Sequence, residues 1–197
     1  MRILIVSRDP SDPTEAGHLE RLEAIWLDCD IHTVAIGEFD VAILGDYDAL
    51  LIAGAYASQA DVPLDALSAL TNLVLEPALP VLGIAWGFQV VCLALGDDLE
   101  DYSQKTTGAP RLVPTAKGET LFQGSDPIRV NEDARWPLEE LPRGWAILAS
   151  SETGIEAFQS KAKPVLAVQQ YPDDFAYESD GKLVYQNLLG MLRNPKK

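Results

Sequence analysis

Residues 80–96, PVLGIAWGFQVVCLALG, have the layout of a nucleophile elbow: an apolar strand, a turn framed by glycines, and a helix. An elbow holds one reactive side chain at its apex, where a serine or cysteine can attack a carbonyl carbon. Here the apex reads Ile84-Ala85-Trp86, and none of these side chains is a nucleophile. The sequence therefore predicts a catalytic turn without its catalytic group.

Two cysteines and two histidines could supply nucleophilic chemistry elsewhere. Cys92 lies about two helical turns beyond Ala85, so we interpret it as a buried core residue. Cys29 and His32 have Cys-x-x-His spacing but no third partner, and His18 is expected on the surface of the first helix. The sequence disfavours a Cys/His or Ser/His pair at the elbow.

Carboxylates are the remaining candidates, because hard cations prefer oxygen ligands. They form three groups: Asp9, Asp12 and Glu15; Asp97, Asp98, Glu100 and Asp101; and Asp173 and Asp174. Such runs are more typical of solvated loops, and the cysteines have no zinc-site spacing. We predict no metal site and no cofactor.

The composition is that of an ordinary globular protein, with 197 residues, 47% hydrophobic and 23% charged. This length fits one domain over residues 1–197. A net charge of -15 argues against a nucleic-acid partner, whose phosphates need lysine and arginine. Two cysteines without a disulfide framework favour a reducing, cytoplasmic location.

Residues 77–96 carry no charge and are long enough to be weighed as a membrane span. Pro80, Gly83, Gly87 and Gln89 break the run into a short strand and a helix. The apolar residues near the amino terminus are too few for a secretory signal. We therefore predict neither a membrane segment nor a signal peptide.

The first half of the chain alternates apolar runs with helical patterns. We expect strands at residues 2–8, 31–37, 48–58 and 81–85, and helices at 14–27, 62–79 and 86–95. Thr14 and Asp61 are the expected helix caps. This alternation predicts an α/β fold with an open, mainly parallel sheet flanked by helices.

The second half of the chain has a different pattern of shorter apolar segments separated by polar residues. Residues 97–107 are expected to be loop, and short strands are expected at 111–125, 127–133, 145–151, 155–160 and 164–170. We expect them to add antiparallel strands to the edge of the sheet. Residues 181–193 are expected to close the chain as an amphipathic helix.

Several segments together resemble the class I glutamine amidotransferase domain. Its elbow, G-I-C-x-G-H-Q, corresponds to residues 83–89, GIAWGFQ, and its oxyanion loop, S-G-G-P-x-S, to residues 53–58, AGAYAS. The later V-x-E-S-H-x-W, L-P-x-G-F, L-A-S-S, I-E-A-F and G-V-Q-F-H-P-E segments have counterparts in the same order. The resemblance covers nearly the whole chain and implies a flavodoxin-like core with added antiparallel strands.

The resemblance also implies where a Cys-His-Glu triad would lie. The nucleophile position is Ala85, the base position Tyr171 and the orienting acid position Asp173. Alanine cannot attack a carbonyl, and neutral tyrosine, with an ordinary pKa near 10, is a poor base at pH 7. We therefore expect no glutaminase activity.

Other departures surround the same site. Ala55 and Tyr56 replace the second glycine and the proline of the oxyanion loop, and Ala134 replaces a histidine. Two interpretations remain open: a pocket filled in by aromatic rings, or a remodelled binding site. The candidate ligand-binding residues are Gly54, Ala55, Tyr56, Trp86, Phe88, Gln89 and Tyr171.

The favoured function is a non-catalytic, amidotransferase-like protein that binds a small ligand or a protein partner through the old site. One alternative is a hydrolase or transferase of another mechanism that uses Tyr171, Asp173 or Ser58. Another is a pseudo-glutaminase subunit that docks on a synthetase, as glutaminase domains of the family do.

Overall fold

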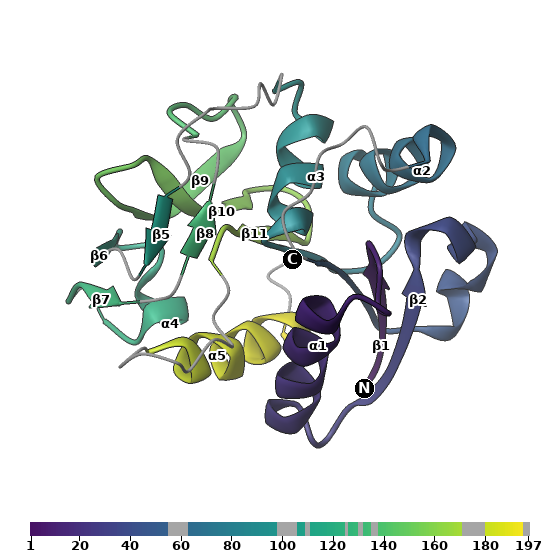
Figure 1. Cartoon of the computed structure of the whole chain (residues 1–197). Coiled ribbons are helices and arrows are strands. Elements are labelled where there is room, and N and C mark those ends of the chain that lie inside the picture. The colour runs from purple at the N-terminus through teal and green to yellow at the C-terminus, as the bar shows by residue number, and fades with distance from the viewer. Residues whose placement is uncertain are drawn as a thin grey trace.

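The computed structural model describes residues 1–54, 63–97, 106–108, 111–124, 126–129, 132–134, 138–170 and 180–194, with only the backbone described for 106–108 and 132–134. Its centre is a mixed sheet with helices on both faces (Figure 1). Within the described residues this sheet has nine strands in the order β2-β1-β3-β4-β11-β10-β9-β6-β7. The strands are β1 (Arg2–Ser7), β2 (Asp30–Ala35), β3 (Ala49–Ala53), β4 (Val81–Ile84), β6 (Arg111–Pro114), β7 (Ile128–Arg129), β9 (Trp145–Ser150), β10 (Ile155–Ser160) and β11 (Val165–Val168).

The parallel half of the sheet follows the expectation closely. Strand β1 pairs in parallel with β2 and β3, and β4 pairs in parallel with β3. Strands β10, β9, β6 and β7 continue it by antiparallel pairing. The α/β class, with a mainly parallel core and added antiparallel strands, is confirmed.

Strand β11 differs from the expectation for the second half. It pairs in parallel with β4, with Val165 opposite Val81 and Val168 opposite Ile84. Its antiparallel hairpin with β10 reverses the chain before β11 reaches β4. The antiparallel strands are therefore joined to the parallel core through β11, which ends beside the elbow.

Two hydrophobic clusters lie on opposite faces of the sheet, because successive side chains of a strand point to opposite sides. Helices α1 (Pro13–Ile25) and α5 (Gly181–Arg193) cover one face, and α2 (Leu64–Leu75) and α3 (Trp86–Ala94) cover the other (Figure 1). The first cluster contains Ile3, Ile5 and Leu82, and the second contains Leu4 and Val81.

The helix boundaries correct three expectations. The cap of α1 is Asp12, not Thr14: its carboxylate accepts hydrogen bonds from the backbone N–H of Thr14 and Glu15. Helix α2 begins at Leu64 after Pro63, and Asp61 lies outside the described residues. It ends at Leu75 rather than at residue 79, because Pro77 disfavours helical geometry at the residue before it.

The second half also departs from the expected strands. Residues 111–125 form the short strand β6 and then a helical turn, α4 (Glu119–Phe122). Strand β5 (Thr106–Gly108), where a loop was expected, pairs with β8 (Glu132–Ala134) in a separate two-stranded sheet. Two short 3-10 helices, Ile36–Glu38 and Val41–Asp46, follow β2.

The uncharged run at residues 77–96 is divided between β4 and α3, as its glycines and proline predict. Within the described part of the chain, every helix is too short or too polar to cross a membrane.

Candidate functional site

The elbow turn is present, with Ala85 at its apex between β4 and α3. Ala85 has φ 54° and ψ -105°, a conformation that residues other than glycine rarely adopt. Its N–H donates to the carbonyl oxygen of Val168 on β11 at 3.0 Å. Its side chain is fully buried in the cluster on the α1 and α5 face. The unusual backbone conformation of the elbow apex is therefore present, although the side chain there is only a methyl group.

The glycines on either side of the apex are required by packing. A Cβ atom on Gly87 would lie 1.9 Å from the carbonyl oxygen of Ile52 on β3. A Cβ on Gly83 would lie 2.5 Å from the carbonyl oxygen of Gly87. These contacts let α3 approach β3 and β4 closely. The glycine pattern of the motif thus has a structural cause that is independent of catalysis.

The backbone N–H of Trp86 is already hydrogen-bonded. It donates to the carbonyl oxygen of Gly54, at the end of β3, with an N···O distance of 3.2 Å. In elbow enzymes, the N–H of the residue after the nucleophile is one of the donors that stabilise the oxyanion. In this structure, that N–H is already occupied by the carbonyl oxygen of Gly54.

The two aromatic residues beside the apex have the surroundings of core side chains. Trp86 and Phe88 are 1% and 2% exposed and belong to the cluster on the α2 and α3 face, opposite the cluster that contains Ala85. The ring of Phe88 packs edge-on against Phe158, with centroids 5.2 Å apart. Their described contacts therefore explain both rings by packing, and a role in ligand binding stays a prediction.

Gln89 differs from these aromatic neighbours because its polar atoms have unmet hydrogen-bonding capacity. The residue is 1% exposed, and within the described part of the chain neither the oxygen nor the nitrogen of its carboxamide has a hydrogen-bond partner. Buried polar groups in proteins are nearly always paired with protein or water. Gln89 is therefore a described candidate at the elbow whose polar atoms are available to a ligand or an ordered water.

A buried network at the carboxyl end of β1 was missed by the sequence analysis, which grouped Glu15 with loop carboxylates. Glu15 is 1% exposed and accepts hydrogen bonds from the Ser7 hydroxyl at 2.6 Å and the Asp9 N–H at 2.8 Å. Arg8 forms an ion pair with it at 2.9 Å. The sequence could have indicated this burial, because Glu15 is four residues before Leu19 and therefore lies on the same, buried side of α1.

The same network explains Gly54. A Cβ on Gly54, which has φ 146°, would lie 3.2 Å from the Oε2 atom of Glu15 and 3.3 Å from the backbone N of Arg8. The Glu15 network therefore packs directly against the residue whose carbonyl oxygen accepts the Trp86 N–H.

A second buried carboxylate lies near the end of β11. Glu156 is fully buried and accepts hydrogen bonds from the hydroxyls of Ser151 and Thr153 and from the carboxamide of Gln170. Gln170 directly precedes Tyr171, the expected base position. Glu156 thus holds Gln170 at the end of β11, the last described residue before the expected base position.

The cysteines and histidines do not meet. Cys92 is buried in α3, and burial, with a smaller contribution from Asp97, raises the pKa of its thiol well above the ordinary value. Cys29 contacts Arg193, with 3.8 Å between sulfur and nitrogen, whereas His32 is hydrogen-bonded to Tyr47. His18 is half-buried and contacts Arg21, rather than lying on the open surface.

The carboxylates of the first acidic group each have a structural contact. Asp12 caps α1, and Glu15 holds the buried network. Hydrogen bonds from Ser11 lower the pKa of Asp9. Among the residues with described positions, no three histidine, cysteine or carboxylate side chains are grouped as a metal site would require.

The remaining candidates lie outside the described residues. They are Ala55, Tyr56, Ser58, Tyr171 and Asp173, together with the acidic residues Asp98, Glu100, Asp101 and Asp174. Ala134 is described only by its backbone, in β8.

Comparison with known proteins agrees with this fold. The family model for glutamine amidotransferase class-I matches residues 18–191. The chain therefore belongs to the class I glutamine amidotransferase family.

Its similar proteins include a glutamine-hydrolyzing GMP synthase subunit of Thermoplasma acidophilum, 26% identical over 156 residues, which cover 78% of this chain and 76% of that protein. The GMP synthase of Streptomyces avermitilis is 25% identical over 122 residues, 59% of this chain but only 22% of that longer protein. A glutamine amido transferase structure from Methylobacillus flagellatus superposes with a TM-score of 0.74 at 16% identity, covering 97% of this chain and 95% of its own.

A solved protein from Thermoplasma acidophilum, assigned to the same GMP synthase subunit type, has the same fold. The TM-score is 0.80 at 23% identity, and the superposition covers 98% of this chain and 94% of that one.

Proposed function

We propose that this chain is a non-catalytic member of its family that binds a small ligand or a protein partner at the elbow and does not hydrolyse glutamine. The observation that carries the proposal is the methyl group of Ala85 at the apex. Glutaminases of this mechanism need a thiolate there. A single domain over residues 1–197 and a cytoplasmic location are part of the same proposal.

Two further observations support this proposal. The Trp86 N–H is bonded to the Gly54 carbonyl oxygen, so one oxyanion donor is occupied. Loss of one such donor costs a typical acyl-transfer enzyme about a hundred- to a thousand-fold in rate. The buried carboxamide of Gln89 has no partner among the residues with described positions, which suits binding of a polar ligand better than complete filling of the pocket.

The direct test is ammonia release from glutamine. We expect no release above the buffer background, and no labelling of residue 85 by electrophilic glutamine analogues, read by mass spectrometry. Turnover of about one per second, at the low end of ordinary enzyme rates, would contradict the proposal.

A second experiment asks how much has been lost. The variant Ala85→Cys, Tyr171→His, Asp173→Glu restores the residue types of the triad. Because the Trp86 N–H would still face Gly54, we expect a reactive thiol with little glutaminase turnover. Ala85→Cys alone is the matched control for thiol reactivity. Ordinary enzyme rates in the triple variant would show that only the triad had changed.

A different chemistry at the same pocket would be revealed by Tyr171→Phe. If the chain catalyses any reaction that depends on the Tyr171 hydroxyl, this variant should abolish it. A binding protein should keep its ligand affinity within a few-fold unless that hydroxyl is a ligand contact.

A synthetase subunit is the second candidate function. The Thermoplasma acidophilum relative is similar to this chain over 76% of its length, and its name describes it as one subunit of a GMP synthase. The tagged chain, purified from its native source, should then recover the other synthase subunit in a stoichiometric complex. Recovery of no synthase subunit, beside a matched acidic tagged control, would contradict this candidate.

A further inference from the structure

A large cavity lies at the end of the sheet opposite the elbow. It has a volume of about 820 Å³, and it begins at the amino ends of β4 and β11, where Val81, Leu82, Val165 and Leu166 line it. Leu82 in β4 is three residues before Ala85, which follows the strand at the turn, and three extended residues span about 10 Å. The cavity is therefore distinct from the elbow site, and a ligand bound there would not touch Ala85.

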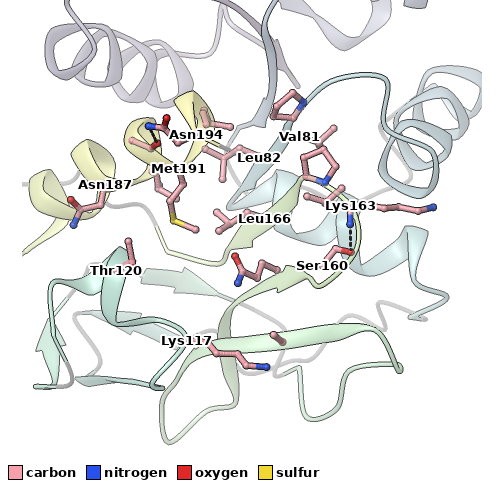
Figure 2. Close-up of a pocket in the computed structure, with 18 of the residues that line it drawn as sticks. Val81, Leu82, Lys117, Thr120, Ser160, Lys163, Leu166, Asn187, Met191 and Asn194 are labelled. Carbon is pink, nitrogen blue, oxygen red and sulfur yellow. Dashed lines mark hydrogen bonds between the residues drawn. The ribbon is translucent and has the colours of Figure 1, made fainter. Parts of the chain in front are cut away.

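Apolar side chains form most of the interior of this cavity. Leu82 and Leu166 from the sheet and Met191 from α5 point into the same space in Figure 2. The side chains of Ala146 on β9 and Gln159 on β10 also line it. Its volume lies within the range typical of small-molecule pockets, about 300–1,000 Å³. A ligand with an apolar body would fit these walls.

The charges around the cavity are opposite to those of the chain as a whole. The sequence has 30 acidic and 15 basic residues, yet the described residues that line the cavity include Lys117, Lys161 and Lys163 and no carboxylate. Lys117 lies across the cavity from Met191 in Figure 2. This sign reversal in a strongly acidic protein favours an anionic ligand.

Two of these lysines are available to a ligand. The Lys163 ammonium group donates to the carbonyl oxygen of Leu75 and pairs with Glu76 at 2.9 Å, so it is already engaged. Neither Lys117 nor Lys161 forms an ion pair with any carboxylate of the described residues. Thr120 and Asn187 also line the cavity.

We propose that this cavity is a binding site for a small organic anion with an apolar body, such as an alkyl carboxylate or alkyl phosphate. The apolar part lies against Leu82, Leu166 and Met191, and the anionic group is paired with Lys117 and Lys161. A second copy of this chain is disfavoured as occupant, because its net charge of -15 would bring two acidic molecules together.

The test uses octanoate and octyl phosphate as anionic probes, with octanol and octylammonium as neutral and cationic controls. Isothermal titration calorimetry should show saturable binding of one or both anions, and weaker or no binding of the controls. Comparing the two anions distinguishes a carboxylate ligand from a phosphate ligand. Binding should weaken between low and high salt, because partly exposed charges are screened.

Two variants locate the site. The double variant Lys117→Gln, Lys161→Gln should weaken anion binding by about fivefold or more, and leave octanol unaffected. Gly190→Leu adds a side chain at a cavity-lining position where a Cβ meets nothing within 4 Å, so it should obstruct binding without disturbing packing. Gly17→Leu, in helix α1, whose residues do not line the cavity, is the matched control and should bind as the wild type does.

Three results would overturn the proposal. The first is no anion binding by the wild-type chain, and the second is octanol binding as tightly as octanoate. The third is a dimer, seen by sedimentation equilibrium, that Gly190→Leu dissociates, since a second copy would then occupy the cavity.

Discussion

Gly87→Ala tests whether close packing of α3 against the sheet requires glycine at the elbow. The added Cβ would lie 1.9 Å from the carbonyl oxygen of Ile52 and 2.6 Å from its carbonyl carbon. Both are backbone atoms of the central strand β3, so no side chain can rotate away. Helix α3 would have to move from the sheet by roughly 1 Å, as in other overpacked cores.

We expect this shift to cost about 3 kcal/mol in the free energy of unfolding, a large share of the roughly 5–15 kcal/mol of a typical domain. It would separate Trp86 and Phe88 from their cluster and lengthen the bond from the Trp86 N–H to Gly54. With a urea slope of about 2–3 kcal/mol per molar, the unfolding midpoint should fall by about 1–1.5 M.

Gly190→Ala is the matched control for the same chemical change. Gly190 lies in helix α5, is exposed, and has open space around an added Cβ. Alanine is favoured over glycine in helices by about 0.8–1 kcal/mol, so this variant should be slightly more stable than the wild type.

The assay is equilibrium urea unfolding, followed by the fluorescence of the buried Trp26 and Trp86. If Gly87→Ala unfolds at the wild-type midpoint, the close approach of α3 to β3 is not what requires glycine there. The same outcome would leave the glycine pattern without a structural explanation.

Further predictions concern the buried groups. Glu15→Ala should cost about 3 kcal/mol or more in the free energy of unfolding, because Ser7, Arg8 and the Asp9 N–H lose a shared buried acceptor. A loss below about 1 kcal/mol would contradict the network. Glu20→Ala, on the exposed side of α1, is the control. Cys92 should resist iodoacetamide in the folded protein while Cys29 reacts, because burial raises the pKa of the Cys92 thiol; equal rates by mass spectrometry would refute this. The neutral Cys92 thiol should contribute fully to the free energy of unfolding below the ordinary thiol pKa near 9.0. This contribution should decline as the pH rises through the raised pKa, and Cys92→Ala should remove the decline.

The sequence identified most elements because their signals are local. The strand at residues 81–84 and the helix from Trp86 follow from an apolar run, two glycines and a helical pattern within a short segment. The closing helix, Gly181–Arg193, was predicted at its observed bounds from its apolar spacing. Cap positions were less accurate, since Asp12 and Thr14 are both good caps and only the fold selects between them.

The sequence alone therefore determined the α/β class, the elbow and the absence of a nucleophile at Ala85. The tertiary structure decided which backbone groups meet there: Val168 of β11 accepts the Ala85 N–H, and Gly54 accepts that of Trp86. It also buried Glu15 against Gly54 and placed Lys117 beside a cavity lined by Met191. These contacts join residues more than thirty positions apart. They are brought together by the order of the strands in the sheet, and no local pattern in the sequence predicts that order.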